Sequence, residues 1–178
     1  MLPNHMIQKA CAMALSASFL MLAQPALAAG PITIAAKIPY LNDGVASPAI
    51  RAECTWNSDV PAAIVAKSKG GVVSTDQDLA SVHGRKLTVT VVNLHAAGGG
   101  GFSGPKWIAM RGELNEDGKV LGNFDFRRTT SHGRMTTCAT LDYIGKALTQ
   151  DILKWLKNPT TNAAPGDAGA ATDQASGA

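Results

Sequence analysis

The sequence predicts an α+β protein in which a three- to four-stranded antiparallel meander packs against a long C-terminal helix and a short N-terminal helix. Three observations predict this class. Residues 86–94 alternate apolar and polar side chains, as a half-buried strand does. Two further strand-like runs flank the turn Asn115-Glu116-Asp117-Gly118. Apolar residues then recur at spacings of three and four between positions 136 and 157, as on one face of a helix.

The first 28 residues have the pattern of a secretory signal peptide. Lys9 precedes an apolar run from Ala10 to Leu22, and Ala26-Leu27-Ala28 has the small residues of a cleavage site. The run is shorter than the roughly 20 apolar residues that a membrane-spanning helix needs. We therefore expect cleavage near Ala28 and a periplasmic or secreted mature chain without a membrane span.

Two cysteines, Cys54 and Cys138, remain after the predicted cleavage, because Cys11 lies in the leader. An oxidising compartment favours their union as a disulfide. The bridge would close a loop of more than 80 residues, and the chain-entropy model gives such a loop a stabilisation of about 4–5 kcal/mol.

Composition and charge indicate one domain with two irregular ends. The net charge of +3 is too small to indicate a nucleic-acid partner. Residues 29–48 hold three prolines and predict an irregular arm with at most one strand. Residues 49–159 predict the single α+β domain. Residues 160–178 contain no large apolar side chain and predict a disordered low-complexity tail.

The N-terminal part of the chain carries weaker signals for secondary structure. Ile32-Thr33-Ile34 is a short apolar alternation, and residues 50–54 suit either a short strand or the lead-in to a helix. Ser58 is a candidate N-cap for a helix over Ala62–Lys69, since Pro61 is tolerated near a helix start. Gly70-Gly71 would end this helix, and extended structure would resume at Val72.

The meander is expected to comprise strands over residues 86–94, 106–114 and 119–128. On the first strand Leu87, Val89 and Val91 share one face. The third strand has an apolar face formed by Val120, Gly122, Phe124 and Phe126. The turn at 115–118 predicts that the second and third strands pair as an antiparallel hairpin.

The last helix is expected to begin at a Thr136 or Thr137 cap and to end near Lys157, before Asn158-Pro159. Its apolar stripe comprises Leu141, Ile144, Leu148, Ile152 and Trp155. This stripe predicts that the helix lies across the apolar face of the meander. Cys138 opens this helix and Cys54 precedes the first one, so their bridge would join the two helix starts.

This order of elements resembles that of small bacterial envelope proteins of unassigned function. In those proteins a strand similar to LTVTVVNL precedes a glycine-rich loop, and a turn similar to EDGKVLGNF precedes the last strand. The likeness extends over about residues 50–158, to the helix end at Trp155-Leu156. It implies an α+β sandwich and an exported location, and it assigns no catalytic residue.

The glycine-rich segment HAAGGGGFSGP fits neither a phosphate-binding loop nor a nucleophile elbow. Pro105 occupies the position at which a phosphate loop has its lysine, and Ser103 lies between two strands rather than before a helix. We therefore interpret the segment as a mobile hairpin tip, which would be a partner-facing loop if the protein binds there. The residues of this predicted partner-facing loop are Gly98, Gly99, Gly100, Gly101, Phe102, Lys106 and Trp107.

The histidines of the mature chain lack the spacing of a metal site. His83, His95 and His132 are not separated by three or four residues, and none lies near a cysteine. We expect no metal and no cofactor. A convergence of the three histidines would still provide acid–base chemistry.

Basic residues at one end of the third strand suggest an anion-binding patch formed by Arg127, Arg128 and Arg134. Strand alternation places Arg127 and Arg128 on opposite faces, which weakens this interpretation. The same charges also suit a solvated strand edge that discourages aggregation.

We expect an exported, non-catalytic envelope accessory or binding protein, because no catalytic constellation stands out. Its partner would be an envelope protein or an anionic envelope polymer. Two alternatives remain open: a small secreted hydrolase that uses the loop histidines, and a secreted effector or inhibitor.

Overall fold

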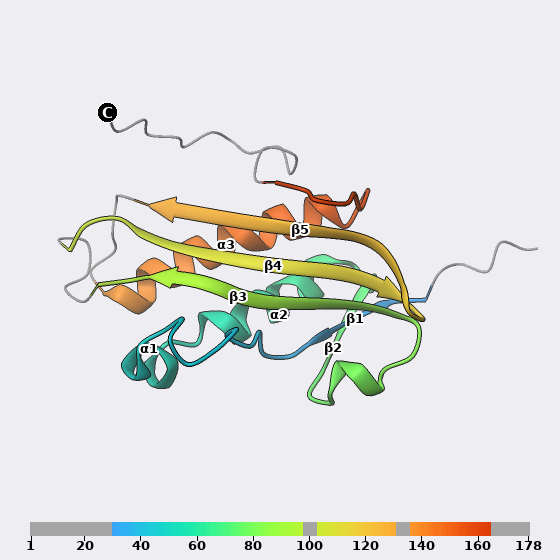
Figure 1. Cartoon of the computed structure of the whole chain (residues 1–178), viewed down its shortest axis with the longest axis horizontal. Helices are drawn as coiled ribbons and strands as arrows, with labels where there is room; N and C mark the ends of the chain where they lie inside the picture. The colour runs from blue at the N-terminus through green and yellow to red at the C-terminus, as the bar shows by residue number, and fades with distance from the viewer. Residues whose placement is uncertain (1–29, 98–102, 131–135, 165–178) are drawn as a thin grey trace, which may run out of the picture.

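A five-stranded mixed sheet with helices on one face forms the body of the protein (Figure 1). The computed structural model describes residues 30–97, 103–130 and 136–164. The strands are β1 (Ile32–Ala35), β2 (Val72–Thr75), β3 (Arg85–His95), β4 (Lys106–Glu116) and β5 (Lys119–Thr130). The helices are α1 (Pro48–Glu53), α2 (Trp56–Lys67), the short 3₁₀ helix η1 (Leu79–Ser81) and α3 (Thr137–Trp155).

The strand order β2-β1-β3-β4-β5 confirms the α+β class and the β3–β4–β5 meander. The sheet has five strands, not the expected three or four, and its pairing is mixed, not purely antiparallel. β1 pairs in parallel with both β2 and β3, so the segment at Ile32–Ala35 is an interior strand. Pairing between Ile32 and Val72 joins positions far apart in the chain, and no local sequence signal reports such a contact.

The meander places most of the expected residues on its core face. Leu87, Val89 and Val91 are buried, as are Phe124 and Phe126. Val120 was expected on the same face but is 44% exposed. The β4–β5 register shifts between Leu114 and Asn115. This irregularity breaks the strict alternation that the sequence prediction assumed.

Helix α3 lies across the sheet as its apolar stripe predicted. Thr136 is the N-cap, and its Oγ1 accepts a hydrogen bond from the backbone N–H of Ala139 at 3.1 Å. The whole stripe is buried: Leu141, Ile144, Leu148, Ile152 and Trp155. The helix contacts β4 and β5 on one side and α2 on the other.

Helix α2 begins earlier than expected, at Trp56, so Pro61 lies inside the helix and Ser58 is not the cap. Pro61 has no N–H to donate to the carbonyl of Asn57. That carbonyl instead accepts a hydrogen bond from the backbone of Ile38 at 2.9 Å. The Asn57 side chain donates back to the Ile38 carbonyl at 3.0 Å. Pro61 thus leaves the Asn57 carbonyl free to accept the hydrogen bond that holds the N-terminal segment against α2.

The Cys54–Cys138 disulfide is present and joins the starts of α2 and α3, as expected. Its two Cα atoms lie 5.1 Å apart, within the usual range for a disulfide. The two helices run side by side from this bridge toward the end of the sheet where β1 begins (Figure 1).

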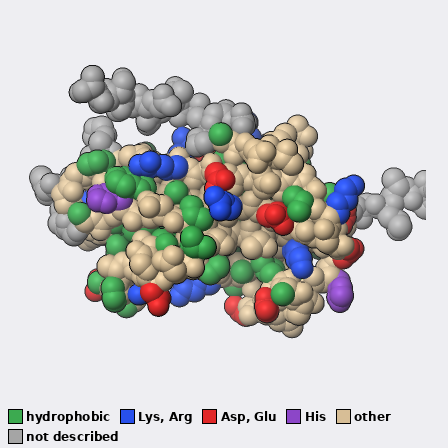
Figure 2. Space-filling view, viewed as in Figure 1, with side chains coloured by type: hydrophobic (Ala, Val, Ile, Leu, Met, Phe, Trp, Pro, Cys, Tyr) green, Lys and Arg blue, Asp and Glu red, His purple; other side chains and the backbone are tan. Residues whose placement is uncertain are grey.

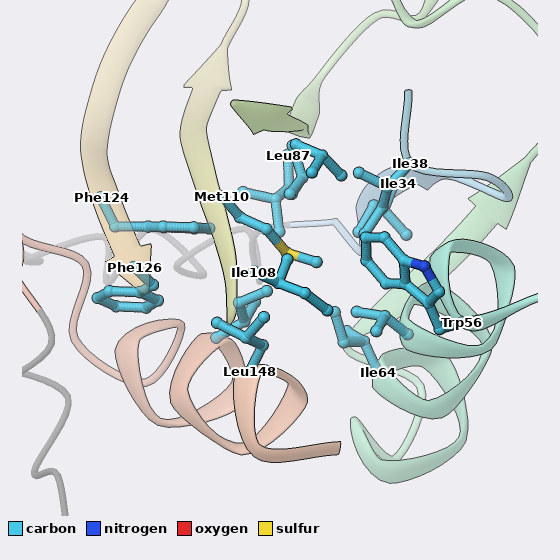
Figure 3. Close-up of a cluster of buried hydrophobic side chains, with 14 of the residues drawn as sticks. Ile34, Ile38, Trp56, Ile64, Leu87, Ile108, Met110, Phe124, Phe126 and Leu148 are labelled. Atoms are coloured by element: carbon cyan, nitrogen blue, oxygen red, sulfur yellow. The ribbon is translucent and has the colours of Figure 1, made fainter. Parts of the chain in front are cut away.

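The core lies between the sheet and the pair of helices (Figure 3). Trp56 is fully buried and points from α2 toward Ile34 and Ile38 (Figure 3). On the other side, Phe124 stacks on Phe126 at 4.4 Å and meets Trp155 edge-on at 5.0 Å. These aromatic contacts add to the burial that holds α3 against the strands.

Residues 160–164, the first part of the predicted tail, run parallel to the edge of β5. The N–H groups of Asn123 and Asp125 donate to the carbonyls of Thr160 and Ala163, at 3.1 and 3.0 Å. Part of the β5 edge is therefore covered by the chain itself, which limits pairing with other molecules. The rest of the predicted tail, 165–178, lies outside the described residues. None of the described helices is long and apolar enough to cross a membrane.

Candidate functional site

An aromatic side chain flanked by two basic ones lies at one end of the open sheet face, which the helices leave uncovered (Figure 1). The Trp107 ring stacks on His95 with centroids 4.1 Å apart and planes 14° apart. Arg127 lies over the ring, with its Cζ 4.6 Å from the ring centroid. We call Asn93, His95, Trp107 and Arg127 the tryptophan cluster. Figure 2 shows histidine, hydrophobic and basic surface adjoining at the left of this face.

A bulge in β3 brings the cluster together. Val91 pairs with Met110 on the core face, but the next pair is Asn93 with Ala109, so the register shifts between them. Residues 93 and 95 consequently point to the open face, although 87, 89 and 91 point to the core. His95 then lies directly opposite Trp107 in the register. Without the extra residue, its imidazole would face the helices.

The contacts of Trp107 hold its ring in place beside Arg127. Trp107 donates its Nε1–H to Asn93 Oδ1 at 2.7 Å. His95 and Arg127 occupy the two faces of the indole, so the ring has no free face for stacking a sugar. A ring beneath a guanidinium attracts it through the cation–π interaction and restricts its motion. The indole therefore serves as a support that positions Arg127.

Arg127 carries the uncompensated charge of this cluster. None of the ion pairs in the described part of the chain includes it. Arg111, on the same face, is paired with Asp125 at 3.0 Å. A guanidinium without a carboxylate partner, held in place on an aromatic ring, is suited to bind a phosphate or carboxylate.

The predicted partner-facing loop is only partly within the described residues. Gly98, Gly99, Gly100, Gly101 and Phe102 lie outside them. Trp107 is on the open face, but Lys106 points the other way and is only 1% exposed. Its Nζ donates to Ser103 Oγ at 2.7 Å. Neighbours on a strand point to opposite faces, so Lys106 and Trp107 do not share one surface.

The predicted arginine patch is not assembled either. Arg127 lies on the open face, whereas Arg128 points to the helix side. There Arg128 forms a bidentate ion pair with Asp151, in which Nε donates to Oδ2 at 2.6 Å and Nη2 donates to Oδ1 at 2.5 Å. Arg134 lies outside the described residues.

The described histidines lie at opposite ends of one strand. His83 is exposed just before β3, and His95 is the last residue of that 11-residue strand. At about 3.3 Å per residue, more than about 30 Å separates them. His132 lies outside the described residues. In residues 30–97, 103–130 and 136–164, no three His, Cys, Asp or Glu side chains gather as possible metal ligands.

Sequence reasoning missed Asn93 and the role of His95, which it placed in a loop. The strand continues to His95 because its register with β4 is maintained after the bulge. The alternation of LTVTVVNLH breaks at two consecutive valines, Val91 and Val92. That break was the signal in the sequence that the faces exchange.

No protein-family model and no curated protein matches the chain. Among solved structures, a DUF330-family protein from Xanthomonas campestris matches with 10% identity and a TM-score of 0.47. The match covers 75% of this chain and 87% of that protein. A PelC dodecamer from Paraburkholderia phytofirmans matches with 16% identity, a TM-score of 0.33, and coverage of 70% and 91%. Both TM-scores lie below 0.5, so neither likeness contributes to the interpretation of the tryptophan cluster.

Proposed function

We propose that the protein is an exported, non-catalytic accessory protein of the bacterial envelope that binds an anionic envelope polymer through its open sheet face. The observation that carries this proposal is Arg127, unpaired among the described ion pairs and supported by the Trp107 ring. A cation held in its bound position loses less entropy on binding than a free one.

Export is supported by two features of the chain. Residues 1–28 have the charge, apolar run and cleavage site of a secretory leader. The Cys54–Cys138 disulfide suits an oxidising compartment, since cytosolic thiols are kept reduced. On these grounds we propose that the mature protein is periplasmic or secreted.

A binding role agrees with the arrangement of the titratable groups better than the hydrolase alternative does. The hydrolase reading needs the loop histidines to converge, and His83 and His95 lie at opposite ends of β3. General acid–base catalysis requires groups within hydrogen-bond reach of one substrate. Arg127 and the Trp107 ring provide recognition of charge without any such requirement.

The proposal is tested by co-sedimentation of the oxidised protein with envelopes from its own source. Arg127→Ala should weaken binding about tenfold or more, since a charge-assisted hydrogen bond contributes roughly 1.5–3 kcal/mol. Arg111→Ala is the matched control, because it removes the same charge from the same face but from an existing ion pair. Binding should weaken as salt rises.

Protease treatment of the envelopes separates the two classes of partner. An anionic polymer retains the protein after digestion of envelope proteins, and that result supports the proposal. Loss of binding after digestion would replace the polymer with a protein partner. Equal binding by Arg127→Ala and Arg111→Ala would show that Trp107 and Arg127 do not form the contact surface.

A further inference from the structure

A cationic pocket lies at the opposite end of the molecule from the tryptophan cluster. It has a volume of about 600 Å³ and is formed where α2 and α3 end and where β1, β2 and β3 begin. This volume is within the roughly 300–1,000 Å³ of small-molecule sites. Ile32, Val72 and Leu153 give it an apolar floor. Its basic lining residues are Lys67, Lys69, Arg85 and Lys157.

The charged residues that line this pocket are all basic. Among the described residues no acidic side chain lines it, and none of the ion pairs in this part of the chain includes any of its four basic residues. Glu116 lies opposite Arg85 in the register, yet no ion pair joins them. The two helix C-termini each contribute about half a negative charge. Four full positive charges exceed that contribution and leave the pocket cationic.

Favourable interaction with the helix ends explains some of these lysines but not the arginine. Lys67 lies in the last turn of α2, where a cation complements the helix dipole. Arg85 lies on a strand, and its Nε is buried with no hydrogen-bond partner among the described residues. A buried N–H of a charged group normally has an acceptor. A bound anion would supply one.

Lys69 provides a second, separate indication. Its φ of +54° is in the left-handed region, which glycine commonly occupies at helix ends. The chain has glycines at the next two positions, Gly70 and Gly71. A lysine thus occupies a position at which a glycine would be less costly, and backbone strain of this kind clusters at functional sites.

We propose that this pocket binds a small amphiphilic anion, with a phosphate or carboxylate head among the four cations and a hydrocarbon body on the apolar floor. The Arg85 side chain would rotate to donate its buried Nε–H to the head, and the lysine ammonium groups would also contact the head. The body would cover Ile32, Val72 and Leu153. This site is separate from the open-face surface, so either proposal stands if the other fails.

Calorimetric titration of the full oxidised chain tests the ligand class with defined probes below their micellar concentrations. Dodecyl phosphate and dodecanoate should each bind with one-to-one stoichiometry. Inorganic phosphate and dodecanol should bind at least tenfold more weakly, because each lacks half of the recognised chemistry. Dodecyltrimethylammonium binding as tightly as dodecyl phosphate, or inorganic phosphate binding as tightly, would overturn the proposal.

Variants locate the site and exclude the helix-end explanation. Lys157→Gln and Arg85→Gln should each weaken dodecyl phosphate binding at least fivefold. Lys154→Gln is the matched control, because it removes a lysine from the last turn of α3 outside the pocket. Equal losses for Lys154→Gln and Lys157→Gln would overturn the site. Methyl NMR signals of Ile32 and Leu153 should shift on titration, and shifts confined to the Trp107 indole would also overturn it.

Discussion

Arg127 and Arg128 are adjacent in the sequence but have opposite environments. Arg127 is on the open face, whereas Arg128 reaches between the sheet and α3 to pair with Asp151. The Asp151 side chain is only 6% exposed, and that of Arg128 is 21% exposed. Arg127 thus belongs to none of the ion pairs among the described residues, whereas Arg128 is a structural group whose removal leaves a buried carboxylate without its partner.

Arg128→Ala should destabilise the fold by about 3–5 kcal/mol, since it leaves a buried charge without its partner. Arg111→Ala, which breaks the exposed pair with Asp125, should cost no more than about 1 kcal/mol. Urea unfolding of both variants measures the difference. Equal losses of unfolding free energy would show that the Arg128–Asp151 pair is no more desolvated than the surface pair.

Asp142 gives the molecule a dependence on pH. Burial raises the pKa of its carboxyl above the ordinary 3.8, the nearby Asp59 raises it further, and Lys146 lowers it in part. Its Oδ1 is buried and has no hydrogen-bond partner among the described residues. The folded state therefore binds this proton more tightly than the unfolded state. The stability contributed by Asp142 is complete below pH 3.8 and is lost as pH rises through the folded-state pKa.

Asp142→Asn should accordingly gain stability over the wild type as pH rises through that window and keep the gain at neutral pH. Unfolding free energies measured across a pH series provide the test. Asp76→Asn, at an exposed position, is the control and should follow the wild type. A gain that is constant with pH would assign the effect to something other than titration of Asp142.

At the level of elements, close packing of the meander against α3 depends on a glycine. Gly112 on β4 lies opposite Phe124 on β5, and the aromatic ring covers the space that a side chain would need. A methyl group at this position would overlap the ring. The ring itself is fixed by Phe126 and Trp155, so it has little room to move.

Gly112→Ala should therefore destabilise the protein by about 1–3 kcal/mol, the usual cost of overpacking. Gly30→Ala is the control, since a methyl group there meets nothing within 4 Å. Thermal unfolding compares the two. A Gly112→Ala protein as stable as the control would show that Phe124 can rearrange freely.

The elements that sequence reasoning predicted well are those specified by local signals. The Thr136 cap and the stripe from Leu141 to Trp155 define α3 within one segment. The turn before Gly118 sets the β4–β5 hairpin. By contrast, β1 has only four residues and pairs with strands far along the chain, and the β3 bulge exchanges faces within a single apolar run. Such features depend on partners that no short window of sequence contains.

The same distinction applies to the candidate site. Trp107 and Arg127 were recognised from their residue types, but their contact depends on the register between β4 and β5. Lys106 was expected at the surface because of its charge. Its position on the core face of β4 buries it, since strand alternation determines direction regardless of polarity.

At the level of the whole molecule, the disulfide joins two halves that are distant in sequence. Its cysteines are 84 residues apart, and the bridge fixes α2 beside α3 over the sheet. In the chain-entropy model a loop of this length stabilises the fold by about 4.5 kcal/mol.

The double variant Cys54→Ala/Cys138→Ala should thus lose a few kcal/mol of unfolding free energy relative to the oxidised protein. Urea unfolding with and without a reductant measures this loss. The reductant should have no effect on the double variant. A reduced wild type as stable as the oxidised one would show that packing alone holds the two helices together.

We propose that the protein works outside the cytoplasm in its oxidised form, and intact-mass spectrometry of the protein from its native source tests this most directly. We predict a chain that begins near residue 29 and is lighter by two hydrogens than its reduced form, with neither Cys54 nor Cys138 open to alkylation before reduction. A chain that still begins at Met1, with both thiols freely alkylated, would contradict this account.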